Sequence, residues 1–404
     1  MRNKENLKFV IVGHVDHGKS TLIGRLLYDT DSISKTKLNE IKQVCESLGK
    51  PLELGYIIDS LEEERIKNIT IDTSQIFFRT NKREYTIIDA PGHVEFLKNM
   101  ITGASQAEAA ILMIDANEGI REQTKRHSYL LKILGINQII VSINKMDLIN
   151  YSEIKFNEIK KKITDFFNKI NLPLNYVIPV SAKKGDNIAK KSNNIGWYNG
   201  PTILKALDEF KQVMNKNENM RFSVQDVYNL NKKIIVGRVE SGILKKGEKI
   251  ILLPSKEEFI IKSIEEYMKD TNEAEAGKAV GLTIEGAERI KRGDIISDLN
   301  LPNITNKFNA HLFWADESKL KKGEEIFIKI STQKTKCFVK EFKKIFNPST
   351  LDEKENLEIL ETNDVAEVVI ETSKPVVVEE FIKNPELGRF VLQKKDICAG
   401  GIII

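Results

Sequence analysis

The stretch Gly13-His14-Val15-Asp16-His17-Gly18-Lys19-Ser20 follows the pattern G-x-x-x-x-G-K-S, which is typical of a phosphate-binding loop. The apolar run Phe9–Val12 precedes it and is predicted to form a buried strand, and the run Thr21–Leu27 suits a helix. A glycine-containing loop between a strand and a helix N-terminus can point successive backbone N–H groups at phosphate oxygens. We expect Lys19 to reach the β- and γ-phosphates of a nucleotide and the Ser20 hydroxyl to bind Mg²⁺.

A second motif, Asp89-Ala90-Pro91-Gly92-His93, follows the apolar run Tyr85–Ile88. Asp89 at a strand end can hold Mg²⁺ through a water molecule, and the Gly92 N–H can contact a γ-phosphate because no side chain blocks the approach. His93 directly follows that glycine, at the place where the attacking water must be oriented. We therefore predict a catalytic role for His93, with polar packing as the alternative.

The long polar region between Leu38 and Ile71 lies between these two motifs and is predicted to be a nucleotide-dependent switch. Within it, Thr70 is the candidate whose hydroxyl and carbonyl meet Mg²⁺ and the γ-phosphate only in the GTP state. Spacing alone leaves open that Thr70 is an ordinary residue at the start of a strand. The predicted catalytic residues are His93, Lys19 and Thr70, and the predicted metal ligands are Ser20, Thr70 and, through water, Asp89.

Two motifs are predicted to read the nucleotide base. Asn144-Lys145-Met146-Asp147 follows Val141–Ile143, and Ser181-Ala182-Lys183 follows the run Val177–Val180. The Asp147 carboxylate can accept both guanine N1–H and the exocyclic amine, a donor pair that adenine lacks. The sequence therefore predicts a GTP- and GDP-binding domain that uses Mg²⁺. Its expected nucleotide-binding residues are Gly13, His14, Val15, Asp16, His17, Gly18, Lys19, Ser20, Thr21, Asp89, Gly92, Asn144, Lys145, Asp147, Ser181, Ala182 and Lys183.

Length and composition bound the class of protein. The 404 residues are too many for one ordinary domain. The 62 basic and 58 acidic residues nearly balance, so the net charge does not predict a surface that binds nucleic acid. The three cysteines are too widely spaced for a metal site and their odd number suits a reducing compartment. No run approaches the roughly 18 apolar residues of a membrane span and no signal region is apparent, so we expect a cytoplasmic protein with no membrane contact.

The pattern of apolar runs predicts three domains. Residues 1–210 alternate short apolar runs with helical patterns, which indicates an α/β domain with a mostly parallel sheet. Residues 211–220 are polar and are predicted to be a linker. Residues 221–302 and 303–404 show short strands separated by turns, which indicates two all-β barrels. Because neither barrel contains a cluster of catalytic residue types, we expect both to bind partners.

This order of domains resembles the translational GTPase superfamily, over the whole chain. Shorter matches resemble sulfate adenylyltransferase subunit 1, the regulatory GTPase subunit: Gly24–Thr30, Lys125–Tyr129, Gly185–Ile188, Trp197–Thr202 and Arg221–Val227. That resemblance implies a GTP hydrolase within a nucleotidyltransferase complex of sulfate assimilation. GTP hydrolysis would then drive formation of adenylyl sulfate from ATP and sulfate on a separate catalytic subunit, the expected partner.

Three residues depart from the pattern of that subunit: His17 stands where Asp is usual, Ala90 where Thr is usual, and Asn68 where Gly is usual. The first two are more similar to an elongation factor. Against that reading, the stretch Arg389–Gly400 lacks the Arg-Thr-Val run typical of factors that carry tRNA. Two alternatives stay open: an elongation-factor-like GTPase that delivers aminoacyl-tRNA, which is the one reading that includes a nucleic acid, and a stand-alone GTPase switch with an unrelated protein partner.

Overall fold

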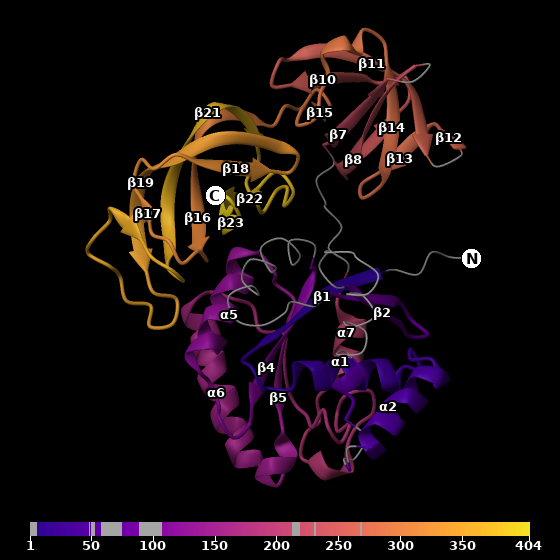
Figure 1. Ribbon diagram of the computed structural model, residues 1–404, viewed down its shortest axis with the longest axis vertical. Helices are drawn as coiled ribbons and strands as arrows, with labels where there is room; N and C mark the ends of the chain where they lie inside the picture. Colours follow the sequence, from indigo (N-terminus) through magenta and orange to yellow (C-terminus); the bar gives the residue numbers. More distant parts are fainter. Residues whose placement is uncertain are drawn as a thin grey trace. The chain divides into compact units, whose positions relative to one another are not determined.

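The computed structural model describes residues 6–47, 49, 53–57, 75–88, 107–211, 219–229, 232–266 and 269–404. The chain divides into two compact units, Met1–Val213 and Met214–Ile404, which we call the nucleotide-binding unit and the two-barrel unit (Figure 1). Among the described residues, none of the helices combines the length and apolar character needed to cross a bilayer.

A six-stranded sheet forms the centre of the nucleotide-binding unit. Its strands are β1 (Asn6–Gly13), β2 (Gln75–Arg79), β3 (Glu84–Ile88), β4 (Ala109–Asp115), β5 (Ile139–Asn144) and β6 (Tyr176–Pro179). They lie in the order β2-β3-β1-β4-β5-β6, and only β2 is antiparallel to its neighbour. The central strands β4 and β5 are buried along their whole length, as their continuous apolar runs predict for a sheet covered on both faces.

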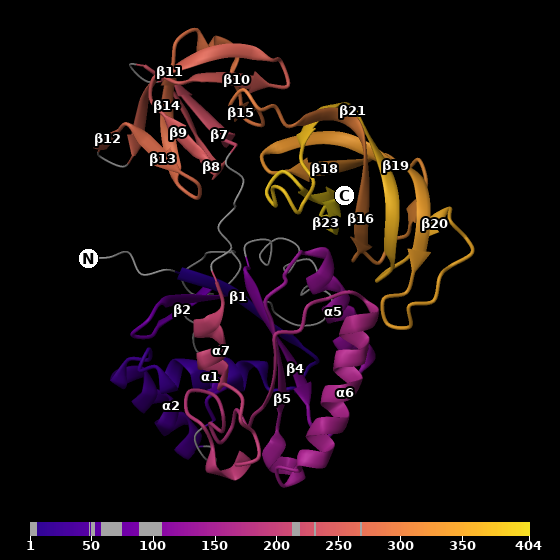
Figure 2. The same ribbon diagram turned by 180° about the vertical axis from the view of Figure 1, so that it is seen from behind.

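Helices cover both faces of this sheet. They are α1 (Lys19–Asp29), α2 (Lys35–Ser47), α5 (Glu122–Ile133), α6 (Glu153–Lys169) and α7 (Ile203–Glu209). In Figures 1 and 2, α5 and α6 lie on one side of the sheet and α1, α2 and α7 on the other. Helix α6 begins after Ser152, whose side chain accepts a hydrogen bond from Lys155 N, and buries one apolar stripe that includes Phe156 and Ile163.

The first barrel of the two-barrel unit contains seven strands of one antiparallel sheet. They are β7 (Arg221–Asn229), β8 (Lys233–Ser241), β10 (Lys249–Leu253), β11 (Glu257–Glu266), β12 (Lys269–Thr271), β14 (Ala279–Ile284) and β15 (Ile295–Ser297). A small pair, β9 (Ile243–Lys245) and β13 (Glu273–Glu275), lies beside them. The order is β10-β15-β7-β8-β14-β11-β12, and β10 also pairs with β11, so six of the strands form a closed ring.

The second barrel is closed as well. Its strands, in order around the barrel, are β16 (Asn303–Trp314), β21 (Val365–Val378), β19 (Gln333–Phe346), β18 (Ile326–Ile330), β22 (Arg389–Gln393) and β23 (Ile397–Ile403). The pair β17 (Leu320–Lys321) and β20 (Ile359–Leu360) lies outside the ring. Trp314 is fully buried in its core, and its indole N–H donates to Ser318 O over 2.6 Å.

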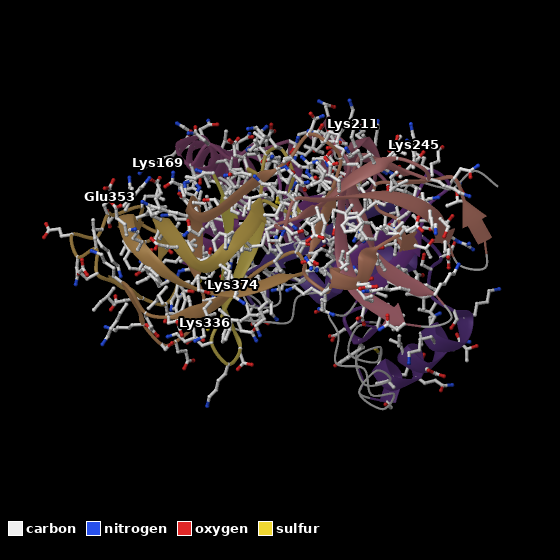
Figure 3. The ribbon with its side chains drawn as sticks, turned by 90° about the horizontal axis from the view of Figure 1, so that it is seen from above. Lys169, Lys211, Lys245, Lys336, Glu353 and Lys374 are labelled. Carbon is white, nitrogen blue, oxygen red and sulfur yellow. The ribbon has the colours of Figure 1, made fainter. Side chains whose placement is uncertain are left out.

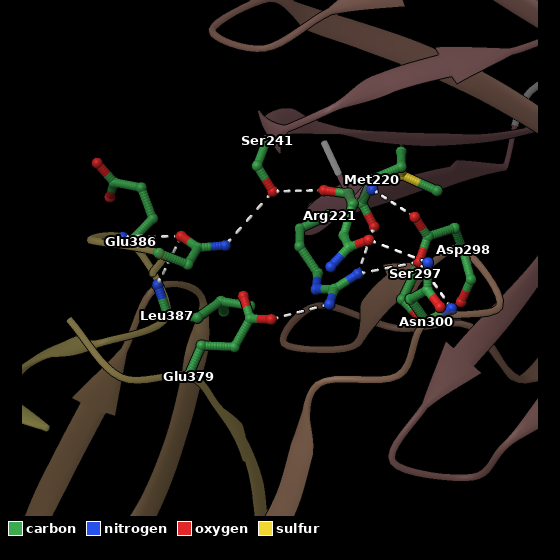
Figure 4. Close-up of polar contacts among 11 residues, drawn as sticks. Met220, Arg221, Ser241, Ser297, Asp298, Asn300, Glu379, Glu386 and Leu387 are labelled. Carbon is green, nitrogen blue, oxygen red and sulfur yellow. Dashed lines mark hydrogen bonds and ion pairs between the residues drawn. The ribbon is translucent and has the colours of Figure 1, made fainter. Parts of the chain in front are cut away.

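A buried arginine joins the two barrels (Figure 4). Arg221 is 1% exposed, and its Nη1 donates to Asp298 Oδ1 over 3.1 Å in the first barrel. Its Nη2 donates to Glu379 Oε1 over 2.8 Å in the second barrel. The apolar side chains of Leu253, Ile295 and Val377, all fully buried, form one cluster that also spans both barrels. The barrels therefore pack against each other across a contact that combines apolar side chains with a buried arginine paired to two carboxylates.

The predicted fold class, an α/β domain with a mostly parallel sheet followed by two all-β barrels, is confirmed. The predicted domain limits stay a prediction. The first barrel's leading strand begins at Arg221 and the second barrel's at Asn303. Most of the predicted linker, residues 212–218, lies outside the described residues.

Replacing Arg221 by methionine should lower the free energy of unfolding of the two-barrel unit by about 3 kcal/mol, because Glu379 would remain a buried carboxylate without its cation. Urea unfolding followed by tryptophan emission measures this change. The matched control is Lys336→Met, which removes an exposed 2.7 Å pair with Glu325 and should change the free energy by less than about 1 kcal/mol. Equal effects of the two substitutions would contradict the role given to Arg221.

Candidate functional site: the nucleotide pocket

The phosphate-binding loop lies between β1 and α1, as predicted. A Cβ atom at Gly13 would lie 2.8 Å from the Met113 carbonyl oxygen on the neighbouring strand, so only glycine fits there. Gly18 has a φ of 92°, in the left-handed region that favours glycine, and it caps the N-terminus of α1. The loop therefore curls tightly around a concave backbone surface, the geometry that backbone N–H groups need to surround a phosphate.

The Lys19 side chain folds back over this loop. Its Nζ donates to Gly13 O over 2.9 Å and to His14 O over 2.8 Å. The ammonium group is thereby held at the mouth of the loop, on the side where phosphate oxygens would meet the N-terminus of α1. Ser20 follows, exposed, in the first turn of the helix. This arrangement can bind a nucleoside phosphate with Mg²⁺. It combines the backbone of the phosphate loop, the Lys19 ammonium group and the exposed Ser20 hydroxyl.

Histidines pack beneath the loop. His17 is fully buried, with Nδ1 3.1 Å from Met113 O and Nε2 3.4 Å from Glu118 Oε2. Burial lowers the pKa of His17 below its usual value of 6.5. The His14 ring meets the His17 ring edge to face at 5.3 Å between centroids, and His14 also bonds Gln123. The buried His17 side chain therefore supports the loop from beneath, and His14 contacts both His17 and Gln123.

Asn144, at the end of β5, connects the phosphate loop to the base-reading loop. Its Nδ2 donates to His17 O over 2.8 Å, and its Oδ1 accepts from Ala182 N over 2.9 Å. The carboxamide is 2% exposed, so both hydrogen bonds are protected from water. The structure thus brings together three of the predicted motifs at one edge of the sheet.

The remaining base-reading residues occupy the same edge. Lys145 has a φ of 62°, and its Nζ lies 2.8 Å from Asp115 Oδ2 at the end of β4. Asp147 is half-buried in the short 3₁₀ helix η2 (Met146–Ile149). Ser181 O accepts hydrogen bonds from two backbone N–H groups, those of Gly185 at 2.8 Å and Asp186 at 3.1 Å, and so closes the loop that carries Ala182 and Lys183.

Supporting residues were not singled out by the sequence analysis. Arg25 on α1 donates from Nε to Ala182 O over 3.1 Å and from Nη2 to Lys183 O over 2.7 Å. Asp115 orients Lys145, and Tyr151 donates to Asp186 Oδ2 over 2.9 Å. Of these residues, only Asp115 gave a signal in the sequence, because it is a carboxylate at the end of the apolar run that forms β4. Arg25 contacts residues more than 150 positions away in the chain, which local patterns do not reveal.

Four predicted residues lie outside the described residues: Thr70, Asp89, Gly92 and His93. Their assigned contacts with Mg²⁺, the γ-phosphate and the attacking water therefore stay predictions.

Family models match all three parts of the chain. The model described as Elongation factor Tu GTP binding domain matches residues 4–215, Elongation factor Tu domain 2 matches residues 232–297, and GTP-eEF1A C-terminal domain-like matches residues 307–404. Elongation factor 1-alpha of Methanocorpusculum labreanum is 41% identical over 99% of this chain and 97% of its own length. The chain belongs to the elongation factor 1-alpha family. The factor of that name from Thermoplasma acidophilum is 40% identical over 99% of this chain and 98% of its own length.

Among solved structures, sup35 complexed with GDP is 24% identical to this chain. The match covers all of this chain and 95% of the sup35 chain, but its TM-score of 0.46 is too low to inform the site.

Membership of the elongation factor 1-alpha family corrects the finer resemblance. The expected sulfate adenylyltransferase activity, sulfate assimilation and catalytic partner subunit were wrong, because the full-length relatives are elongation factors. Three of the short matches that suggested them contain structural residues: a Cβ at Gly24 would clash with the Leu54 backbone, Trp197 bonds a backbone carbonyl, and Arg221 joins the barrels. Because such residues support the fold, their presence indicates a shared fold and does not identify a partner.

The missing Arg-Thr-Val run did not exclude the elongation factor 1-alpha family either. In its place, Lys394 pairs with Glu324 over 2.7 Å and Cys398 is buried in the second barrel. Both side chains help to hold the barrel together, so a local change there is compatible with the family.

The stability of the nucleotide-binding unit should depend on pH through His127, which is buried on α5. Burial, together with the positive charge of Lys19, lowers the pKa of His127 to about 3, from 6.5. The unfolded chain therefore takes up a proton at higher pH than the folded chain. We expect the free energy of unfolding to fall by about 1.4 kcal/mol per pH unit from this group as pH drops from about 6.5 towards 3, and to be independent of it above that window.

Urea unfolding of the wild type and of His127→Gln, at pH values between 8 and about 4.5, measures this dependence. The two stability curves should converge as the pH falls. Parallel curves would contradict the assignment.

Proposed function

We propose that this chain is an elongation-factor GTPase that carries aminoacyl-tRNA when GTP is bound and releases it after hydrolysis. The observation that carries the proposal is the 41% identity to an elongation factor 1-alpha over 99% of the chain, through the nucleotide-binding unit and both barrels alike. Other relatives share this full-length match, among them Elongation factor 1-alpha of Archaeoglobus fulgidus, which is 38% identical over 99% of this chain.

In this proposal the described residues bind and orient GTP. Lys19 neutralises the β- and γ-phosphates at the mouth of the loop, and the backbone N–H groups of Gly13–Thr21 surround them. Ser20 would hold Mg²⁺ together with Thr70 and, through water, Asp89, and the ion would neutralise charge that develops on the phosphates. Asn144 holds the phosphate loop against the loop that carries Ala182. Asp147 in η2 and Ala182 in that loop would contact guanine.

The remaining roles fall on residues outside the described ranges. His93 would orient the water that attacks the γ-phosphate, with Gly92 contacting that phosphate. Thr70 would report the state of the nucleotide, because its contacts exist only with GTP. A switch of this kind can act on tRNA only if its two states bind tRNA with different affinities.

Protection of the aminoacyl ester tests the proposal. The chain loaded with a non-hydrolysable GTP analogue should slow spontaneous deacylation of aminoacyl-tRNA, and the GDP-loaded chain should need a concentration at least about tenfold higher for the same protection. Uncharged tRNA as competitor provides the control. Equal protection with the two nucleotides, or none with either, would overturn the proposal.

The base assignment predicts a change of nucleotide preference. Asp147→Asn replaces a carboxylate acceptor by an amide, which should shift preference from guanine to xanthine nucleotides by about 100-fold or more, since a mismatched buried polar pair costs 1–3 kcal/mol on each side. Titration of both proteins with fluorescent GDP and XDP measures the preference. Asp165→Asn, an exposed change on α6, is the control. An unchanged preference for GDP in Asp147→Asn would refute the role of Asp147.

A further inference from the structure

The Arg25 guanidinium lies against the base-reading loop with an acceptor at each of its three nitrogens. Nε donates to Ala182 O over 3.1 Å, and Nη2 donates to Lys183 O over 2.7 Å. Nη1 lies 3.5 Å from Asp29 Oδ1, one helical turn further along α1. Because the guanidinium is a rigid planar fork, these contacts fix both its position and its orientation.

Little of the Arg25 side chain is open to water. Lysines such as Lys169 and Lys374 are exposed at the surface, where solvent screens their charge (Figure 3). The Arg25 side chain is only 16% exposed. The centroid of the Tyr28 ring lies 5.5 Å from Arg25 Cζ, and a Cβ atom at Gly185 would lie 3.3 Å from Nη1. The charge of Arg25 therefore acts on the neighbouring peptide groups with less screening than an exposed cation.

One backbone N–H group of the base-reading loop is available to a nucleotide base. Most N–H groups from residue 181 to residue 186 donate to acceptors within the protein, namely those of Ser181, Ala182, Lys184, Gly185 and Asp186. The N–H of Lys183 has no acceptor among the residues that the structure describes. In particular, the Ala182 N–H is already bonded to Asn144 Oδ1, so Lys183 supplies the donor that remains.

Arg25 bonds the opposite end of the peptide group to which this N–H belongs. The C=O of Ala182 and the N–H of Lys183 form one planar trans unit, in which they point in opposite directions. A cation bonded to the oxygen draws electron density away from the nitrogen, so the N–H becomes a stronger donor. The same bond fixes the plane of the peptide, and with it the direction of the N–H.

A strong donor at this place favours guanine over adenine. Guanine has an acceptor, O6, at the purine position where adenine has an amine donor. The Asp147 carboxylate is assigned to guanine N1–H and the exocyclic amine, so O6 is the atom left for the Lys183 N–H to read. With adenine, two donors would face each other and both would stay unpaired.

We propose that Arg25 is a positioning residue that sets base specificity, because it orients and polarises the Ala182–Lys183 peptide so that the Lys183 N–H donates to guanine O6. Arg25 acts through this peptide and does not touch the nucleotide. The proposal rests on the guanine-nucleotide binding in the proposed function and is independent of tRNA binding.

Nucleotide analogues distinguish this role from simple packing. Arg25→Met keeps a long side chain beside Tyr28 and Gly185 but removes every donor. It should weaken the binding of GDP about tenfold, and that of inosine diphosphate, which keeps O6 but lacks the amine, by the same factor. The binding of 6-thio-GDP should weaken less than about threefold, because its sulfur is a weak acceptor that gains little from a stronger N–H. Competition against fluorescent GDP on the full chain measures all three affinities.

Two further variants complete the test. Arg25→Lys keeps the charge and one donor, so its loss of GDP affinity should be smaller than that of Arg25→Met. Arg79→Met, an exposed change on β2, is the control and should alter each affinity less than about twofold.

Three outcomes would overturn the role of Arg25. They are equal losses for GDP and 6-thio-GDP in Arg25→Met, which a loosened pocket would produce, no loss for GDP, or equal losses of GDP affinity in Arg25→Lys and Arg25→Met. A wild-type chain that binds no guanine nucleotide would overturn the proposed function as well, so the two failures are distinguishable.

Discussion

The Asn144 carboxamide joins two loops that lie far apart in the chain, and the nucleotide pocket depends on this connection. One of its hydrogen bonds holds the carbonyl of His17 in the phosphate loop, and the other holds the N–H of Ala182 in the base-reading loop. Both bonds are buried, so neither loop can move away without leaving a polar group unsatisfied. Phosphate recognition and base recognition are thereby kept at a constant distance, which a single nucleotide requires.

A similar constraint acts in the two-barrel unit, where Arg221 is bonded to carboxylates of both barrels. A buried guanidinium is stable only while its partners stay in place, so the barrels are held in one relative orientation. Under the proposed function, in which the chain carries a large ligand, this rigidity matters physically. A small rearrangement near the nucleotide can reposition a whole binding surface only if that surface does not deform.

The family assignment shows how motifs of different kinds inform function. The four nucleotide motifs identified a GTP-binding domain correctly, because phosphate and guanine each demand particular residue types at strand ends. The finer resemblance failed at Gly24, Trp197 and Arg221, whose roles are packing and support. Residues of that kind recur wherever the same fold recurs, so they do not distinguish one partner from another.

The sequence by itself determined the α/β domain, the two all-β barrels and the residues of the phosphate and base motifs, because periodicity and glycine spacing are local properties of the chain. Only the tertiary structure decided which distant residues support them. Arg25 reaches Ala182, Asp115 orients Lys145, and Arg221 meets Glu379 through contacts that depend on how strands and barrels pack.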